Sequence, residues 1–306
     1  MIISDRVYGK HEFSQPVITE LINSNTVQRL KKISQYGMPD KYYHKKNGFT
    51  RYEHSIGVAI LLAKSNAPLK EIIAGLLHDV SHSAFSHVID VIYGDSSIEG
   101  IQDQLLPQFI NSTEIKNILE KHHLNVNEIS ELNNFTLLEQ PIPDLCADRI
   151  DYSLREITCD GENEKAKRIF QNLTTYNNIF CFKNVETAKE FGITFLKLQE
   201  EHWGGFQARI RYEFLGKALK KAIEKKIITK EDLYTDDETV LNKLEKSNDK
   251  EILKILSNLK QNKFPPESEL KKKNRFVNPR ILIKEKLIKL SEIDTEYNEK
   301  IQKYLK

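Results

Sequence analysis

Three of the nine histidines of the chain fall between Ala74 and His87, and one carboxylate lies among them. An apolar run, Ile72 to Leu77, leads directly into the adjacent pair His78 and Asp79. If that run is buried, an imidazole and a carboxylate reach the edge of a core, which is unfavourable unless a cation or hydrogen bonds compensate. Taken alone, the pair fits the solvated polar end of a helix better than a metal site.

Two other segments carry residues of the same chemical types. His54 stands at the start of an apolar segment, where a single histidine is more often a cap or a residue at the edge of the core than a ligand. Asp148 lies in the polar segment from Asp144 to Glu156. At helical spacing Asp148 shares one face with Tyr152, Arg155 and Glu156. The alternative interpretation of that face is a solvated stripe of salt bridges that includes an Asp151–Arg155 pair.

Considered together, His54, His78, Asp79 and Asp148 form an ordered set of two imidazoles and two carboxylates. His54 and His78 are 24 positions apart, and Asp79 and Asp148 are 69 positions apart. Such ligands suit Mn²⁺, Fe²⁺, Co²⁺ or Zn²⁺, and carboxylates also bind Mg²⁺. The three cysteines, at positions 146, 159 and 181, lack metal-ligand spacing and are expected to be free thiols.

Composition limits the class of protein. The 306 residues are 39% hydrophobic and 29% charged, which fits a globular protein with an ample core. The first residues show no signal peptide, and no apolar run reaches the roughly 18 residues of a membrane span. We therefore expect a cytoplasmic protein with no membrane partner. The net charge of +2 is too small to indicate nucleic acid, and the basic segments Lys217–Lys226 and Lys271–Arg275 are interpreted first as solvated faces.

The low content of glycine and proline predicts a mostly helical fold. Five predicted helices surround the polar residues: Thr26 to Gln35, Tyr52 to Ser65, Leu69 to Asp79, His87 to Tyr93, and one running through Asp148 and Arg155. Residues 160–178 are predicted to be irregular. Residues 188–226 are predicted to be helical in two pieces around Trp203 to Gly205. Short strands are predicted at residues 179–182, 276–277 and 281–283.

Seven segments then support a family assignment: Asp5–Gly9, Gln28–Leu30, Ile33–Gly37, Arg51–Val58, Gly75–His87, Asp148–Tyr152 and Phe276–Asp294. Together they resemble the HD-domain metal-dependent phosphohydrolases, and in particular the deoxynucleoside triphosphate triphosphohydrolase branch. The resemblance covers most of the chain and is densest from Asp5 to Glu156. It implies a mostly α fold, with an HD-domain helical core over residues 1–160. A helical extension with a small C-terminal α+β portion would follow over residues 161–306.

The resemblance also implies roles for individual residues. His54, His78, Asp79 and Asp148 would hold the metal, and a metal-bound water would attack phosphorus. The remaining implied residues fall into two groups. Those on the phosphate side are Arg51 for the polyphosphate, His82 near the phosphates, His87 as general acid and Asp90 to orient His87. Those on the sugar side are Gln35 and Glu156 for the hydroxyls and Tyr152 for packing. The family typically has Asp where this chain has Glu156.

Two departures from the family pattern bear on activity. Ile98-Glu99 stands where the family usually has His-Glu, so one imidazole of the triphosphate chemistry is missing. The adjacent pair His122-His123 is a possible substitute, although a surface role near a helix end fits it better. Val80-Ser81 replaces the usual Leu-Gly between Asp79 and His82.

The sequence therefore predicts a metal-dependent phosphohydrolase acting on nucleotides, with dNTPs as the first expectation. Hydrolysis of nucleoside monophosphates or other small phosphate esters is the enzymatic alternative. A degenerate HD protein that binds nucleotide without turnover, and a nucleic-acid-binding module, are the alternatives from other classes. The pattern is compatible with a homo-oligomer and leaves base preference and metal identity open.

Overall fold

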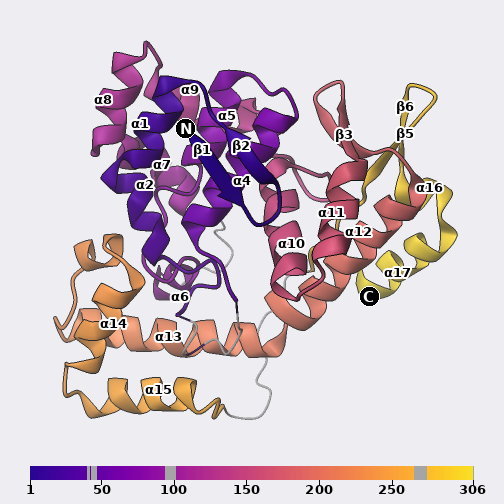
Figure 1. Ribbon diagram of the computed structural model, residues 1–306. Helices are drawn as coiled ribbons and strands as arrows, with labels where there is room; N and C mark the ends of the chain where they lie inside the picture. Colours follow the sequence, from indigo (N-terminus) through magenta and orange to yellow (C-terminus); the bar gives the residue numbers. More distant parts are fainter. Residues whose placement is uncertain (40–41, 43–46, 94–100, 265–273, 306) are drawn as a thin grey trace.

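The fold is mostly helical, as the sequence predicts (Figure 1). The computed structural model describes residues 1–39, 42, 47–93, 101–264 and 274–305. A two-stranded hairpin lies near the N-terminus, and a small four-stranded sheet packs with the last helices. Within the described ranges, no helix has both the length and the apolar character needed to cross a bilayer.

The first half of the chain contains α1 (Pro16–Asn23), α2 (Asn25–Arg29), η1 (Leu30–Lys32), α4 (Arg51–Lys64), α5 (Leu69–Leu77), α6 (Val88–Tyr93), α7 (Ile101–Asn111), α8 (Glu114–Lys121), α9 (Val126–Ser130), η2 (Leu132–Asn134) and α10 (Ala147–Cys159). The second half contains α11 (Asn163–Asn172), α12 (Val185–Leu198), η3 (Gln199–Trp203), α13 (Phe206–Glu224), η4 (Glu231–Tyr234), α14 (Asp237–Glu245), α15 (Lys250–Lys260), α16 (Leu290–Ile293) and α17 (Thr295–Leu305). The strands are β1 (Ile2–Asp5), β2 (Gly9–Glu12), β3 (Leu173–Tyr176), β4 (Ile179–Phe182), β5 (Arg280–Ile283) and β6 (Lys286–Lys289).

Helix α4 packs against both α5 and α10 and so organises the site. It begins at a complete capping box, in which the Thr50 hydroxyl accepts from the Glu53 amide and the Glu53 carboxylate accepts from the Thr50 amide. Gly57 lets α10 approach closely. A Cβ added there would lie 1.8 Å from Arg155 Nη2 and 2.1 Å from Asp151 Oδ1. A side chain at this position would therefore displace two polar groups of α10.

Two apolar clusters form the core. The larger cluster contains residues near the N-terminal hairpin and residues of α4, α5 and α10, and these pack with residues of α12 and of the four-stranded sheet. The smaller lies between four residues of the N-terminal half (Tyr36, Met38, Tyr42 and Phe49), the segment from Ala84 to Ile89, and the three helices α13, α14 and α15, which we call the α13–α15 lobe. The larger cluster contains residues from both sides of position 160. The division of the chain at that position stays a prediction.

Several predicted elements are confirmed, and others are corrected. The strands at residues 179–182 and 281–283 are present, and the long helical region is divided by the π-helical turn η3. Residues 160–178 are not irregular. They form α11, which buries Ala166 and Ile169, and β3, which pairs antiparallel with β4. The helix predicted to run to Gln35 ends at Lys32, because Ser34 forms a bridge with Thr50. Residues 276–277 are not a strand.

Candidate metal centre

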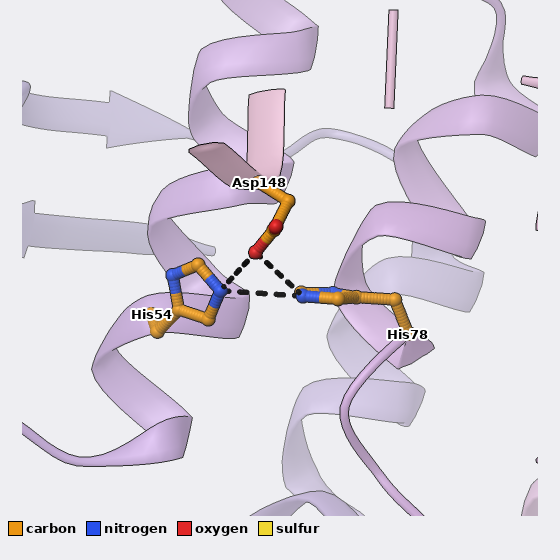
Figure 2. Close-up of side chains that lie close together, drawn as sticks. All are labelled: His54, His78 and Asp148. Atoms are coloured by element: carbon orange, nitrogen blue, oxygen red, sulfur yellow. Dashed lines mark hydrogen bonds and ion pairs between the residues drawn. The ribbon is translucent and has the colours of Figure 1, made fainter. Parts of the chain in front are cut away.

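Three of the predicted ligands converge at the junction of α4, α5 and α10 (Figure 2). His54 is on the first turns of α4, His78 is the residue that ends α5, and Asp148 is in the first turn of α10. The Nε2 atoms of the two histidines are 3.3 Å apart. Oδ1 of Asp148 is 2.9 Å from Nε2 of His54 and 3.6 Å from Nε2 of His78. Both imidazoles are buried.

A second contact fixes the orientation of each imidazole. Nδ1 of His54 is 2.7 Å from Oδ2 of Asp151, and Nδ1 of His78 is 2.7 Å from the carbonyl oxygen of Gly75. Both partners are acceptors, so each Nδ1 carries the hydrogen and donates it. When the imidazoles are neutral, as a metal requires, their Nε2 lone pairs face each other beside a carboxylate. This donor set fits a divalent cation, which would be held by two Nε2 atoms and carboxylate oxygens.

Asp79, the fourth predicted ligand, faces the same point. Its Oδ2 is 3.8 Å from Nε2 of His54, and its Oδ1 is 3.6 Å from Nε2 of His78. The Nη1 group of Arg51 donates to Oδ2 at 2.8 Å, and Nε2 of His82 lies 3.1 Å from Oδ1. Asp79 therefore connects the cluster to the residues predicted on the phosphate side.

The electrostatics of the cluster favour positive charge. Burial alone would lower the pKa of His78, but the nearby Asp79 and Asp148 outweigh it and raise the pKa to about 10. Burial would raise the pKa of Asp148, but hydrogen bonds with His54 and His78 hold that pKa below its ordinary value. The two carboxylates thus favour positive charge at the imidazoles, and a divalent cation would supply that charge in place of the protons.

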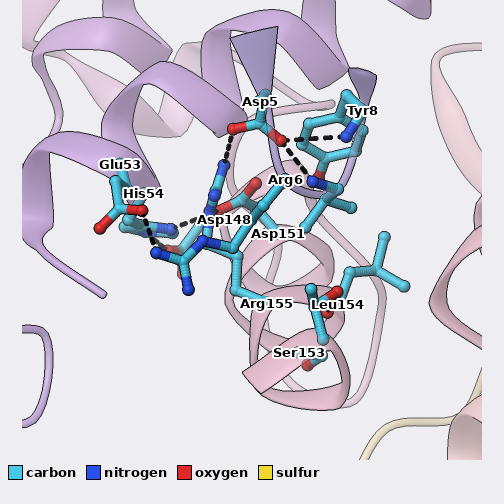
Figure 3. Close-up of polar contacts among 12 residues, drawn as sticks. Asp5, Arg6, Tyr8, Glu53, His54, Asp148, Asp151, Ser153, Leu154 and Arg155 are labelled. Carbon is cyan, nitrogen blue, oxygen red and sulfur yellow. Dashed lines mark hydrogen bonds and ion pairs between the residues drawn. The ribbon is translucent and has the colours of Figure 1, made fainter. Parts of the chain in front are cut away.

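A buried series of ion pairs reaches His54 at Nδ1, the ring nitrogen that faces away from the other candidate ligands (Figure 3). Asp151 accepts from Nε of Arg155 at 2.7 Å, and Nη2 of Arg155 donates to Asp5 at 2.7 Å. The side chains of Asp151 and Arg155 are fully buried. The interpretation of this face as a solvated salt-bridge stripe is therefore wrong, because α4 and the N-terminal hairpin cover it.

The comparisons with known proteins agree with this geometry. Residues 51–156 match the family described as HD domain. The chain is 38% identical over 312 residues to Uncharacterized protein YdhJ of Bacillus subtilis, across 99% of this chain and 94% of the relative. It is 31% identical over 232 residues to Metal-dependent phosphohydrolase cns2 of Cordyceps militaris, across 73% of this chain and 67% of the relative. The chain belongs to the HD-domain metal-dependent phosphohydrolases.

A solved structure shows the same fold. The crystal structure of a phosphohydrolase from Bacteroides thetaiotaomicron has a TM-score of 0.71 at 15% identity, across 96% of this chain and 94% of that chain. The expectation of a helical HD-domain fold is therefore confirmed.

In this HD-domain phosphohydrolase, the predicted phosphate-side residues lie on or beside one loop, Val80–His87, which we call the histidine loop. Burial, and then the charge of Arg51, lower the pKa of His82 to about 3, so this imidazole is neutral. The rings of His82 and His87 are in contact, with centroids 5.1 Å apart. The side chain of His87 is 44% exposed, and its Nδ1 lies 3.6 Å from Oδ2 of Asp90. The His87–Asp90 pair that the family resemblance implies is therefore present as a contact.

Of the predicted sugar-side residues, Tyr152 lies beside the histidines. The ring of Tyr152 lies 6.3 Å from the ring of His54. The buried amide oxygen of Gln35 has no hydrogen-bond partner within the described part of the chain. Glu156 is 1% exposed, and its carboxylate accepts from Tyr36 and Trp203 and lies 3.2 Å from Nε2 of His202.

Several site residues carry no sequence signal. His202 and Trp203 contact Glu156 from outside the family motifs that suggested the site, whereas Tyr36, which also contacts Glu156, lies inside Ile33–Gly37. The break of the helix at Trp203 is the one hint, because π-helical turns are frequent at functional sites. Burial raises the pKa of Tyr212 to about 12, and the charges of Arg51, Glu156 and Asp90 act on the same hydroxyl.

Two other histidine and acid clusters are accounted for by neighbouring residues. His122 lies at the end of α8, and its Nε2 is 3.1 Å from Oε1 of Glu20 in α1. Glu139 and Cys146 lie near Asp148, but the guanidinium of Arg149 is 3.2 Å from Cys146 Sγ and 3.6 Å from Glu139. That guanidinium already supplies a positive charge to the cluster. Ile98-Glu99, where the family has another histidine, lies outside the described residues.

Proposed function

We propose that this phosphohydrolase cleaves nucleotides, with dNTPs as its first substrate class. The observation that supports the proposal is that a cationic and an aromatic side chain lie beside the candidate metal centre: Arg51 donates to Asp79, and the ring of Tyr152 is 6.3 Å from the ring of His54. Arg51, His82 and His87 are on or beside the histidine loop, while Tyr152, Gln35 and Glu156 supply an aromatic face and polar groups. The motif resemblance to dNTP triphosphohydrolases supports the same substrate class.

His54, His78, Asp79 and Asp148 would hold a divalent cation, with Mn²⁺ the first to test. Such a cation polarises a phosphoryl oxygen and lowers the pKa of a water molecule. The chain supplies the remaining chemistry. The buried guanidinium of Arg51 offers positive charge toward a phosphate, and His87 would donate a proton to the leaving oxygen. Asp90, 3.6 Å from His87, keeps that imidazole oriented.

Glu156 would act on the sugar side through a network. Its carboxylate is held by Tyr36 and Trp203, so a sugar hydroxyl would meet a fixed acceptor. The orphan amide oxygen of Gln35 offers a second acceptor for a hydroxyl. Tyr152, packed edge-on against Trp203 with centroids 4.9 Å apart, would present its ring to the sugar.

The experiment is a nucleotide panel with a defined metal. Purified protein is incubated with Mn²⁺, Mg²⁺, Co²⁺ or Zn²⁺ and with dNTPs, nucleoside monophosphates and simple phosphate esters. Release of tripolyphosphate from dNTPs is the expected result. Release of phosphate from monophosphates alone would assign the protein to the alternative class, which the isoleucine at position 98 favours. Saturable binding without any product would indicate a sensor.

Ile98→His tests the missing imidazole directly. If the absent histidine limits triphosphate chemistry, the variant should release tripolyphosphate faster than the parent protein at equal metal content. An unchanged rate would show that other residues, such as His82 and His87, are sufficient.

A nucleic-acid function has less support. Within α13 and α15, Lys217 pairs with Glu213 at 3.0 Å, Lys221 with Glu251 at 3.1 Å, and Lys225 with Asp249 at 2.6 Å. These acids offset much of the charge of the Lys217–Lys226 segment. Residues 271–273 of the second basic segment lie outside the described residues. Steeply salt-dependent binding to RNA or DNA would restore this alternative.

A further inference from the structure

The histidine loop has a backbone that its own residues do not favour. Phe85 and Ser86 have φ values of 61° and 47°, in the left-handed region. A bulky residue such as phenylalanine rarely adopts this conformation, and neighbouring structure must hold it in place. The loop carries His82 and His87, so whatever holds it also sets where these imidazoles lie.

The contacts that hold the loop come from distant parts of the chain. Nη2 of Arg29 donates to the carbonyl oxygens of Val80 and His82, at 2.8 Å each. The amide of Ala84 donates to the carbonyl oxygen of Leu233 at 2.6 Å. These bonds fix the first part of the loop, up to the residue that precedes Phe85.

Asp237 joins the loop to a second segment, as does the Ser86 hydroxyl, which donates to the carbonyl oxygen of Ser34 at 2.9 Å. Oδ1 of Asp237 accepts from the amide of Phe85 at 2.7 Å, and its Oδ2 accepts from the amide of Ser34 at 2.9 Å. One carboxylate therefore ties the histidine loop to the turn that carries Gln35. The two segments are already close, because a Cβ on Gly37 would lie 2.8 Å from the carbonyl oxygen of Phe85.

Helix capping does not explain this carboxylate. Asp237 is the first residue of α14, but the cap is Asp236, whose side chain accepts from the amide of Thr239 at 2.8 Å. Asp237 is only 4% exposed, and burying a carboxylate is unfavourable unless it makes specific hydrogen bonds. Here its two oxygens serve two loops of the site and none of the donors of its own helix.

We propose that Asp237 is a positioning residue, through which the α13–α15 lobe holds His82, His87 and the Gln35 turn in their working arrangement. The inference rests on the roles proposed above for these residues. It makes the lobe part of the catalytic unit, although its residues lie far along the chain from every metal ligand.

The charges around Asp237 make its action dependent on pH. Burial raises the pKa of Asp237 to about 6, against two amide donors that favour the ionised form. Asp236 on the same helix adds negative charge, while Arg51 and Arg29 face the carboxyl from the opposing elements, and Lys32 pairs with Asp236. Protonation of Asp237 near this pH would weaken the hydrogen bonds that its carboxylate accepts from the amides of Phe85 and Ser34.

The test compares Asp237→Asn with Asp236→Asn. Asparagine caps a helix as well as aspartate does, so the second variant is a matched control with the same change of charge. In Asp237→Asn, one oxygen becomes an NH₂ group that cannot accept. Amide hydrogen exchange in residues 34–37 and 80–87 should become at least several-fold faster, with α4 unchanged, and the control should match the parent protein.

Activity provides the second readout. With the best substrate of the panel, Asp237→Asn should lose roughly tenfold in kcat, the scale of loss expected when reacting groups are misplaced. Metal content should not change. The ratio of the parent's kcat/KM to the variant's should change between pH 5 and 7, since residue 237 titrates there in the parent protein and has no proton to exchange in Asp237→Asn.

Unchanged exchange in both loops of a folded Asp237→Asn protein would overturn the proposal, as would an equal effect of Asp236→Asn. If Asp237→Asn does not fold, Asp237→Glu keeps both acceptor oxygens on a longer arm and is judged by the same exchange criteria. If no nucleotide is cleaved, the function proposed above fails, while the exchange measurement still decides the role of Asp237.

Discussion

The metal centre and the histidine loop are adjacent but are held in different ways. At the metal centre, side chains on or at the ends of helices hold one another, as in the contacts of His54 with Asp151 and of His78 with Gly75. In the histidine loop, remote side chains hold the backbone itself, with Asp237 and Arg29 as the main examples. The first arrangement fixes where ligand atoms point, and the second fixes where a whole segment lies.

This difference separates binding from turnover. Changes at the metal centre should alter metal affinity first, because they move donor atoms. Changes in or behind the loop should alter turnover while the metal stays bound. Four variants test that separation.

Asp79→Ala should have the largest effect, because Asp79 faces both imidazoles and also anchors Arg51. Metal content and turnover should disappear together, with a loss of metal affinity above the roughly 10–100-fold typical of groups behind a ligand. Elemental analysis and a nucleotide assay measure both. Glu120→Ala, which removes an exposed carboxylate of α8, is the control. Activity that survived without metal would refute the metal-dependent mechanism.

His87→Ala should lower turnover by about 10²–10⁴-fold, the range for loss of a general acid. The exposed ring of His87 touches His82 but is paired with Asp90 and not with the ligand cluster, so metal content should be unchanged. Single-turnover kinetics and elemental analysis on the same sample check this. Loss of the ion would make His87 a ligand and would merge the two regions.

Asp151→Asn should weaken metal binding by roughly 10–100-fold, because His54 loses its charged partner. It should also lower the free energy of unfolding, toward the lower end of the roughly 3–5 kcal/mol for a broken buried ion pair, since Asp5 still pairs with Arg155. Asp5→Asn is the matched variant. It should reduce stability with less effect on metal affinity, as measured by titration calorimetry and thermal unfolding.

The smallest expected effect is a pH dependence of stability at Asp237. Its pKa is about 6 in the folded protein and near 3.8 in the unfolded chain, so folding takes up a proton between these values. Protonation of Asp237 therefore adds at most about 3 kcal/mol to the free energy of unfolding. This stabilisation is fully present below about pH 4 and is lost as the pH rises through about 6. Denaturant unfolding of the parent protein and Asp237→Asn from pH 4 to 7 should show this difference. Parallel curves would contradict the assignment.

The segments that carry the proposed metal ligands could be predicted, because the information for them is local. The apolar periodicity after His54 and before His78 predicts the helices, and the ordered set of donor types indicates the candidate site. The same local reasoning also paired Asp151 with Arg155, at four positions on one helix. It placed the pair in solvent, because nothing nearby in sequence says that α4 and the N-terminal hairpin cover it.

The supports of the loop could not be predicted, because their partners are remote. Ser34 and Asp237 are 203 positions apart, and Phe85 and Asp237 are 152 apart. An aspartate at the start of a helix looks like an ordinary cap in sequence. Only the position of Asp236 in space shows that the cap is already supplied and that Asp237 has another use.

The chain of charges from Asp5 through Arg155 to Asp151 also bears on how the protein folds. Asp5 and Arg155 are 150 positions apart, so their contact closes a very long loop. Contacts of such sequence separation slow folding, since chain entropy is lost before they form. During synthesis from the N-terminus, the Asp5–Arg155 contact cannot form before α10 is made, and the Ser34–Asp237 contact cannot form until still later. Metal affinity should therefore be acquired only after α10 (Ala147–Cys159) has been made, about half-way along the chain, and the arrangement of the histidine loop later still.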